Sequence, residues 1–180
     1  TILVKKDYFS KYSFKSKSKQ YNLKREKCIQ IILDNLKGED IVVSTTGKTS
    51  RELNEFSDKN ESKNPMFYTI GGMGHANQIS LGISNNCSKR VFCFDGDGSV
   101  IMHMGSMGIV GNNAKNNYYH VLFNNGTHES VGGQPTIGDV INFDLLSESL
   151  GYKDYYKLTS EHDLSYFFKN TLDSVEGPML

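Results

Sequence analysis

The chain has few cysteines, and they show no pattern that would build a metal site or a disulfide framework. Its three cysteines, Cys28, Cys87 and Cys93, lack the short paired spacing of zinc ligands. An odd number of cysteines without a framework is typical of reduced thiols. We therefore expect a cytoplasmic protein with free thiols.

The sequence also lacks an excess of charge, long apolar runs and a leader pattern. Its formal net charge is +0, with 20 Lys and Arg against 20 Asp and Glu, which argues against nucleic acid held through its phosphates. No apolar run approaches the length of a membrane span, and no signal-peptide pattern opens the chain. We expect no nucleic-acid partner and no membrane partner.

A chain of 180 residues is long enough for one domain with its own core, and we find no internal repeat or second domain. Residues 1–19 are rich in Lys and Ser, a composition that rarely forms a core. We expect a linker from an upstream domain or a solvated tail there, and a folded domain over residues 20–180. The chain stops at Met179 and Leu180 within an apolar run, which predicts truncation before the last strand.

Hydrophobic periodicity predicts alternating strands and helices. The expected strands cover residues 41–43, 66–70, 90–94, 118–123 and 155–158, with a further one starting at 177. The expected helices cover residues 22–36, a segment after 47, 76–85, 99–110, 142–150 and 160–172. Asn22, Asn142 and Ser160 are the expected N-caps. This order predicts an α/β fold, a doubly wound three-layer αβα sandwich with a mainly parallel sheet.

A turn of small hydroxyl residues follows the first expected strand. Thr46, Gly47, Lys48 and Thr49 stand at the start of a helix, where free N–H groups and the positive end of the dipole suit a phosphate. The end of a P-loop motif is present, but Val42 stands where its first glycine would be, so we exclude a P-loop. An ordinary capped turn remains the alternative.

A second turn is rich in glycine. Gly71, Gly72 and Gly74 surround Met73, and glycine permits the close backbone approach of a flat ligand. The alternatives are purely structural roles, in which Met73 fills the core and His75 caps the following helix.

Two polar turns at expected strand ends form a pair. The first is Gly96-Asp97-Gly98-Ser99, and the second is Asn124-Asn125-Gly126-Thr127. One crossover helix fits between them, so a βαβ unit would bring both turns to the edge where α/β sheets bind ligands. A carboxylate, an amide and backbone carbonyls suit Mg²⁺ that is also held by phosphates. Two unrelated turns are the alternative.

A polar, glycine-rich loop continues from the second turn to residue 138 and contains His128. Long loops at the carboxyl end of a strand tend to carry function. We therefore favour a functional loop over an ordinary surface loop.

The chain resembles thiamine-diphosphate-dependent decarboxylases over about residues 22–180. Four phrases carry the resemblance: Gly-Gly-Met-Gly-His-Ala at 71–76, Asp-Gly-Asp-Gly-Ser at 95–99, Met-His-Met-Gly-Ser at 102–106 and His-Glu-Ser-Val-Gly-Gly-Gln-Pro-Thr at 128–136. Within that family the chain is similar to phosphonopyruvate decarboxylase and, a little less closely, to sulfopyruvate decarboxylase.

The resemblance implies the diphosphate-binding domain of such an enzyme, with thiamine diphosphate and Mg²⁺ as cofactors. Asp97, the Asn125 side chain and the Thr127 carbonyl match the metal ligands. The cofactor-binding positions that match are Thr46, Gly47, Lys48, Thr49, Gly71, Gly72, Met73, Gly96, Gly98, Ser99 and Gly126. Met73 matches the apolar residue that bends the cofactor. Residues 128–136 would line the substrate side, with His128 as the candidate catalytic residue.

The resemblance also implies a partner. The family's general acid–base glutamate belongs to a pyrimidine-binding domain, and no residue here matches it. The site would form with an upstream part of the same chain or with a separate subunit, and we expect a homo-oligomer. The implied reaction converts a 2-keto acid, phosphonopyruvate, to phosphonoacetaldehyde and CO₂, in phosphonate metabolism. Sulfopyruvate decarboxylation is the alternative.

Two hypotheses from other classes are weaker. A nucleotide- or flavin-binding module would carry Gly-x-Gly-x-x-Gly after its first strand, and that motif is absent there. A regulatory or scaffold domain would not need Asp97 and Asn125.

Overall fold

A parallel sheet forms the centre of the computed structural model, which describes residues 2–10 and 21–180. Its strands are β1 (Ile41–Ser44), β2 (Met66–Tyr68), β3 (Val91–Gly96) and β4 (Tyr118–Phe123), in the order β2-β1-β3-β4. All neighbouring pairs are parallel. β3 lies in the middle and is buried along almost its whole length, as its apolar sequence predicts.

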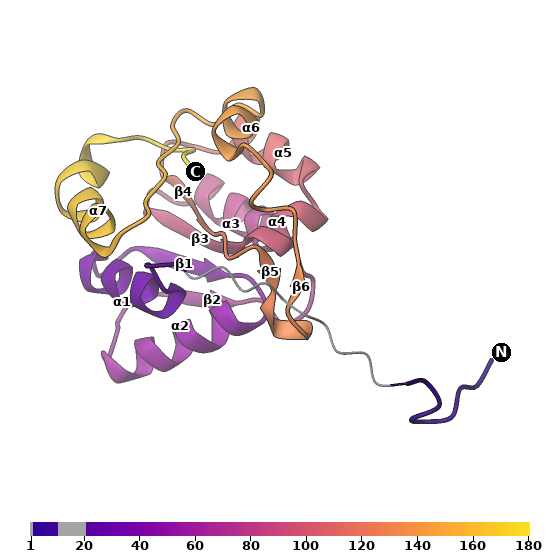
Figure 1. Cartoon of the computed structure of the whole chain (residues 1–180). Coiled ribbons are helices and arrows are strands. Elements are labelled where there is room, and N and C mark those ends of the chain that lie inside the picture. Colours follow the sequence, from indigo (N-terminus) through magenta and orange to yellow (C-terminus); the bar gives the residue numbers. More distant parts are fainter. Residues whose placement is uncertain (1, 11–20) are drawn as a thin grey trace.

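Helices cover both faces of this sheet (Figure 1). The α-helices are α1 (Arg25–Asn35), α2 (Lys48–Lys59), α3 (Ala76–Asn85), α4 (Asp97–Met102), α5 (Gly105–Asn113), α6 (Phe143–Ser149) and α7 (Glu161–Tyr166). The chain continues beyond α7 as a π-helical turn (Phe167–Thr171) and a 3₁₀ turn (Leu172–Ser174). The predicted α/β fold with a parallel sheet between helical layers is confirmed.

Two apolar cores lie on opposite faces of the sheet because successive strand residues point to opposite sides. Phe92 and Phe94 of β3 face the helices α1, α2 and α7, together with Ile32 and Leu53. The alternating residues of β3 pack instead with α3, α5 and α6 in the second core. Each large side chain that is buried in this way contributes about 1.5–3 kcal/mol, so both helical layers are held on the sheet.

Two of the three predicted N-caps are confirmed. The Asn142 side chain accepts hydrogen bonds from Asp144 N–H and Leu145 N–H, and the Ser160 hydroxyl accepts one from Asp163 N–H. The Asn22 prediction was wrong, because α1 begins three residues later, at Arg25, and has no side-chain cap.

The single helix expected at 99–110 is divided in two. His103 leaves helical geometry, with φ −130° and ψ 46°, and separates α4 from α5. The Ser106 hydroxyl donates to the His103 carbonyl at 2.7 Å, so one of the last carbonyls of α4 is satisfied by the first turn of α5. The helical spacing of the apolar residues in 99–110 does not reveal such a break.

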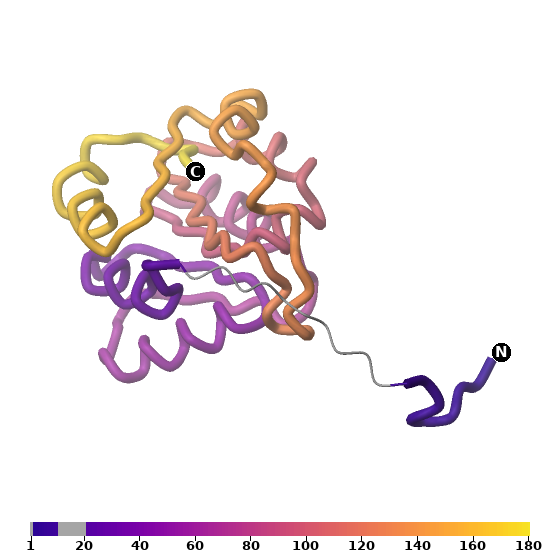
Figure 2. Tube along the Cα trace, in the orientation of Figure 1, coloured from indigo at the N-terminus to yellow at the C-terminus, as the bar shows by residue number. Residues whose placement is uncertain are grey.

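The strand expected at 155–158 was also wrong, because only a bridge forms, at Asp154. The end of the chain instead lies between β4 and residues 153–156: Met179 bridges Tyr119 on one side and Asp154 on the other, both in parallel. Figure 2 shows the yellow end of the trace returning to the middle of the molecule beside β4.

The loop expected at 124–138 contains a small hairpin. β5 (Thr127–His128) pairs antiparallel with β6 (Gln134–Pro135), and a 3₁₀ turn (Glu129–Val131) lies between them. The hairpin is at the carboxyl end of the parallel strands, beside the start of α2 (Figure 1).

The predicted tail covers residues 1–19, and residue 1 and residues 11–20 lie outside the described residues. Residues 2–10 form no helix or strand and are exposed. The division into a tail and a domain over 20–180 stays a prediction. None of the described helices is long and apolar enough to cross a membrane.

Candidate functional site

The paired turns lie at the carboxyl ends of two neighbouring strands. β3 pairs with β4 up to Gly96 and Phe123, and α4 starts directly afterwards with Asp97. Asn124 and Asn125 follow β4 at the same edge. The structure therefore brings together the two halves of the motif, as the βαβ argument predicts.

Asp97 is a buried carboxylate, with only 2% of the residue exposed. The Thr136 hydroxyl donates to its Oδ2. A Cβ atom added to Gly138 would lie 2.6 Å from the same oxygen, so the returning loop reaches the carboxylate only because residue 138 has no side chain. Within residues 2–10 and 21–180, no Lys, Arg or His forms an ion pair with Asp97.

The second half of the motif is shaped by its own amide side chains. Asn124 Nδ2 donates to the Gly138 carbonyl at 2.8 Å, and Asn124 Oδ1 accepts from Gly126 N–H at 3.2 Å. Asn125 Oδ1 accepts from Thr127 N–H at 3.1 Å. Asn124 thus closes the base of the loop, and Asn125 turns the chain toward the hairpin.

His128 lies directly against the first half of the motif. A Cβ atom added to Gly98 would lie 2.5 Å from two atoms of the His128 ring. Glycine at position 98 therefore allows the imidazole to approach the start of α4.

The turn before α2 is in contact with the hairpin. Gly47 has a φ of +103° and its Cβ would lie 2.7 Å from Ser130 Oγ, so glycine is needed for both its conformation and the contact. Lys48 N–H donates to the same Ser130 oxygen at 3.2 Å. The start of α2 thus has no cap from its own N-cap side chain, and a hairpin residue takes that place.

Ser99 joins the two remaining turns to this group. Its hydroxyl bonds with the Thr45 hydroxyl at 2.9 Å and accepts from Gly74 N–H at 2.9 Å. Gly71 N–H donates to the Thr46 hydroxyl at 3.4 Å. The structure therefore gathers the hydroxyl turn, the glycine turn around the half-buried Met73 and the Asp97 turn into one cluster. The cofactor-binding and catalytic roles expected of these residues stay predictions.

A protein-family comparison matches residues 45–180 to the thiamine pyrophosphate enzyme C-terminal TPP-binding domain. The chain belongs to this family. The match contains all three turns and the hairpin.

Relatives of this TPP-binding domain include two kinds of decarboxylase. The phosphonopyruvate decarboxylase of Streptomyces viridochromogenes is 37% identical over 152 residues, which are 84% of this chain and 37% of the relative. The sulfopyruvate decarboxylase subunit beta of Methanocaldococcus jannaschii is 34% identical over 151 residues, which are 83% of this chain and 78% of the relative. The chain thus spans a little over a third of the first relative's length.

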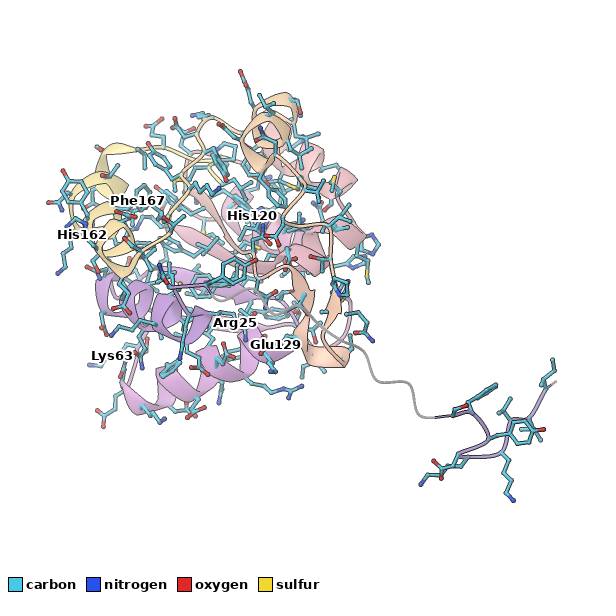
Figure 3. All side chains as sticks on the ribbon, in the orientation of Figure 1. Arg25, Lys63, His120, Glu129, His162 and Phe167 are labelled. Carbon is cyan, nitrogen blue, oxygen red and sulfur yellow. The ribbon has the colours of Figure 1, made fainter. Side chains whose placement is uncertain are left out.

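An ion-pair cluster of Arg25, Lys48, Glu52 and Glu129 at the edge of the TPP-binding domain was not expected from the sequence. Arg25 binds Glu52 through two nitrogens, at 2.7 and 2.6 Å, and donates to Glu129 at 2.9 Å. Lys48 Nζ donates to Glu129 at 2.6 Å. Figure 3 shows Arg25 and Glu129 side by side at the hairpin. Burial raises the pKa of Glu129, but hydrogen bonds from Lys48 and Arg25 together lower it by more. The net shift of this pKa is therefore downward.

A chain of buried polar groups behind the site was also not expected from the sequence; it is formed by Gly96 N–H, Asp95, His120 and Tyr152. Asp95 and His120 are 0% and 2% exposed. Their signal was present, because each is a polar residue inside an otherwise apolar buried strand. The ion-pair cluster had no such signal, since Arg25 occupies an ordinary helical position far from Glu129 in sequence.

Proposed function

We propose that this chain is the diphosphate-binding domain of a thiamine-diphosphate- and Mg²⁺-dependent decarboxylase that acts on a 2-keto acid. Phosphonopyruvate, with phosphonoacetaldehyde and CO₂ as products, is the first candidate substrate. Sulfopyruvate is the second, because relatives of both kinds are similar to the chain at nearly the same level.

The observation that carries this proposal is the buried Asp97 carboxylate at the junction of the two turns. An ionised carboxylate that is removed from water without a cationic partner is costly. A divalent cation would supply the missing charge, and the nearby oxygens of Asn125 and Thr127 are hard donors that Mg²⁺ prefers. The donor set therefore fits Mg²⁺, and Asp97, Asn125 and Thr127 are the residues that would hold it.

The surroundings fit the cofactor as well. Besides the Lys48 N–H that donates to Ser130, the first turn of α2 offers further backbone N–H groups and a positive dipole end for a diphosphate. Gly71 and Gly72 are exposed, with φ of +77° and +58°, so a flat ring can approach their backbone. When bound, thiamine diphosphate supplies the electron sink for loss of CO₂. The protein's part is to bind and orient this group, and to exclude water through the hairpin.

A partner domain is part of the proposal. Ile70 is 97% exposed, Val131 71% and Val140 84%. These apolar residues lie next to the glycine turn, in the hairpin and just after Gly138, so each belongs to a segment that contributes to the proposed site. Exposed apolar groups that gather around a site are typical of an interface. We infer that a pyrimidine-binding domain, fused or separate, covers them and supplies the acid–base glutamate, in a homo-oligomeric enzyme.

The candidate substrates need a cationic contact within the proposed site. Both carry a tetrahedral anion beside the keto acid, and such an anion is recognised by Lys or Arg. Lys48 is half-exposed beside His128's hairpin and is the first candidate for this contact, with Arg51, His75, His128 and Gln134 as others.

The test is CO₂ release by this chain assembled with its pyrimidine-binding partner, with thiamine diphosphate and Mg²⁺. Phosphonopyruvate, sulfopyruvate and pyruvate are offered separately. Preference for phosphonopyruvate supports the first candidate, and preference for sulfopyruvate supports the second. Absence of release from all three, with the cofactor still bound, would refute the proposed substrates. Absence of cofactor binding would refute the proposed site.

A further inference from the structure

The buried polar chain connects the turn before Asp97 to the segment after α6. Gly96 N–H donates to Asp95 Oδ1 at 3.0 Å. Asp95 Oδ2 lies 3.5 Å from His120 Nε2, and His120 Nδ1 lies 2.9 Å from the Tyr152 hydroxyl. Figure 3 shows His120 in the interior, away from the ion-pair cluster.

The parallel register places these groups on one face of the sheet. Cys93 of β3 is paired with His120 of β4, and Asp95 is two residues beyond Cys93, so all three point to the same side. Tyr152 approaches this face from the other side of His120, with its ring stacked on the imidazole at a centroid distance of 6.1 Å. In this series of polar groups, Asp95 is therefore the member nearest the Asp97 turn, and Tyr152 is the member farthest from it.

The two inner atoms, Asp95 Oδ2 and His120 Nε2, face each other, and Cys93 Sγ lies within 4.8 Å of an oxygen of Asp95 and a nitrogen of His120. Asp95 Oδ2 and His120 Nε2 are fully buried and make no hydrogen bond to another group among the described residues. Leaving buried polar atoms unpaired costs about 1–3 kcal/mol each. Since the atoms face each other at 3.5 Å, a small rotation of the imidazole completes the bond. Burial also raises the pKa of Tyr152 above its usual 10.0, so this hydroxyl stays protonated.

We propose that His120, oriented by Tyr152, is a positioning residue that fixes the Asp95 carboxylate and thereby the Gly96–Asp97 turn for metal binding. Asp95 binds the N–H of the residue directly before Asp97, so rotation of Asp95 would move the backbone that presents the metal ligand. The inference rests on the proposed Mg²⁺ site. Metal ligands are commonly oriented by hydrogen-bonded neighbours whose loss weakens metal affinity about 10–100-fold.

One other use of these side chains must be separated from this inference. Cys93 Sγ, an Asp95 oxygen and a His120 nitrogen lie within 4.8 Å of one another, and thiolate, carboxylate and imidazole can together bind zinc. We favour the hydrogen-bonded chain because Tyr152 and Gly96 N–H already orient its two charged or ionisable members from outside. Metal analysis of the purified protein decides between the two.

The experiment measures Mg²⁺ affinity of the assembled apoenzyme at fixed thiamine diphosphate by isothermal titration, with Mn²⁺ binding by electron paramagnetic resonance as a second probe. His120→Leu removes both ring nitrogens, and His120→Gln keeps an amide donor for Asp95. We expect a metal affinity about 10-fold weaker or more for His120→Leu and restoration to within about threefold by His120→Gln. Tyr152→Phe removes only the hydroxyl, so a smaller loss of about threefold is expected.

Tyr118→Phe is the matched control. Tyr118 is a fully buried tyrosine on the same face, but its hydroxyl donates to the Asn77 carbonyl at 3.2 Å, away from the Asp97 turn. It should leave Mg²⁺ affinity unchanged. If His120→Leu fails to fold, the comparison of Tyr152→Phe with Tyr118→Phe still decides.

Four results would overturn the inference. Unchanged metal affinity in both His120→Leu and Tyr152→Phe would exclude a positioning role, and an equal loss in Tyr118→Phe would mean general loosening of the core. About one equivalent of zinc in the wild-type protein would make the cluster a metal centre instead. Failure of the wild-type assembly to bind Mg²⁺ would refute the proposed function as well, whereas the first three results leave it intact.

Discussion

The two halves of the paired-turn motif, at Asp97 and at Asn125, are supported in different ways. The first half, at the end of β3, is almost completely buried: Asp97 is 2% exposed and Ser99 3%. The second half, after β4, belongs to an exposed hairpin that side-chain bonds and the ion-pair cluster attach to α1 and α2. Core packing holds the first half in place, and surface contacts hold the second half.

This difference indicates that the two halves differ in how easily they move. A side chain within a packed core keeps its position because protein interiors are dense and hardly compressible. A hairpin attached by partly exposed ion pairs can open at low cost, since such pairs contribute only about 0–1 kcal/mol each. We infer that the Asp97 turn is the fixed part of the site and that the hairpin with His128 is the adjustable part.

The largest expected effect comes from the fixed half. Asp97→Ala should weaken Mg²⁺-dependent binding of thiamine diphosphate more than about 100-fold, because the carboxylate proposed to hold the metal is lost, and loss of even an indirect partner of a metal weakens its binding about 10–100-fold. Calorimetric titration of the assembled apoenzyme measures it. Asp34→Asn, at an exposed carboxylate on α1, is the control and should retain binding. Cofactor binding that survived Asp97→Ala would refute the metal site.

The contact between the halves gives the next effect. Gly98→Ala places a methyl group at the His128 ring, so the imidazole must move. We expect activity to fall about 10- to 100-fold through misplacement, with the free energy of unfolding changed by less than about 1 kcal/mol, since a side-chain end can rotate away. Steady-state kinetics measures the activity, and chemical denaturation measures the free energy of unfolding.

Gly82→Ala provides the matched control for that change. Gly82 lies on α3 with nothing near its Cβ position, so alanine should stabilise the helix by about 0.5–1 kcal/mol without loss of activity. Full activity in Gly98→Ala would mean that His128 is not needed where the structure places it.

A smaller effect is expected from the adjustable half. Glu129→Gln removes the charge that binds both Arg25 and Lys48, so the hairpin should open more often. The free energy of hairpin opening should fall by on the order of 1 kcal/mol. Hydrogen exchange of residues 127–136 measures this opening. Glu55→Gln, which breaks an exposed ion pair with Lys59 within α2, should leave the exchange of those residues unchanged. Equal protection in Glu129→Gln and wild type would show that Ser130 and the backbone alone hold the hairpin.

The smallest expected effect is that of salt. Raising ionic strength from about 0.05 to 0.5 M shortens the screening length to a few ångströms, so the hairpin should lose protection modestly while β3 and α4 keep theirs. The same exchange experiment reports both halves. A salt effect of equal size in the two halves would contradict the comparison.

Local features of the site were predictable from the sequence. The Gly-Asp-Gly and Asn-Asn turns, one helix apart and each after an apolar run, were enough to place both at one edge of a parallel sheet. The caps at Asn142 and Ser160 were predictable for the same reason, because capping needs only a side chain and the backbone a few residues ahead. Asn22 had the right residue type but lay too far before the helix.

Features that depend on partners distant in the sequence could not be predicted. Ser99 is joined to Thr45 and Gly74, and Arg25 to Glu129, over separations that no periodic pattern encodes. The break at His103 and the insertion of Met179 beside β4 likewise depend on neighbours that only packing selects. The sequence by itself therefore determined most strands and helices, the polar turns and the residue types of the proposed metal site, through local periodicity and residue type. Tertiary structure decided which of these groups meet, because long-range contacts depend on how the two cores pack against the sheet.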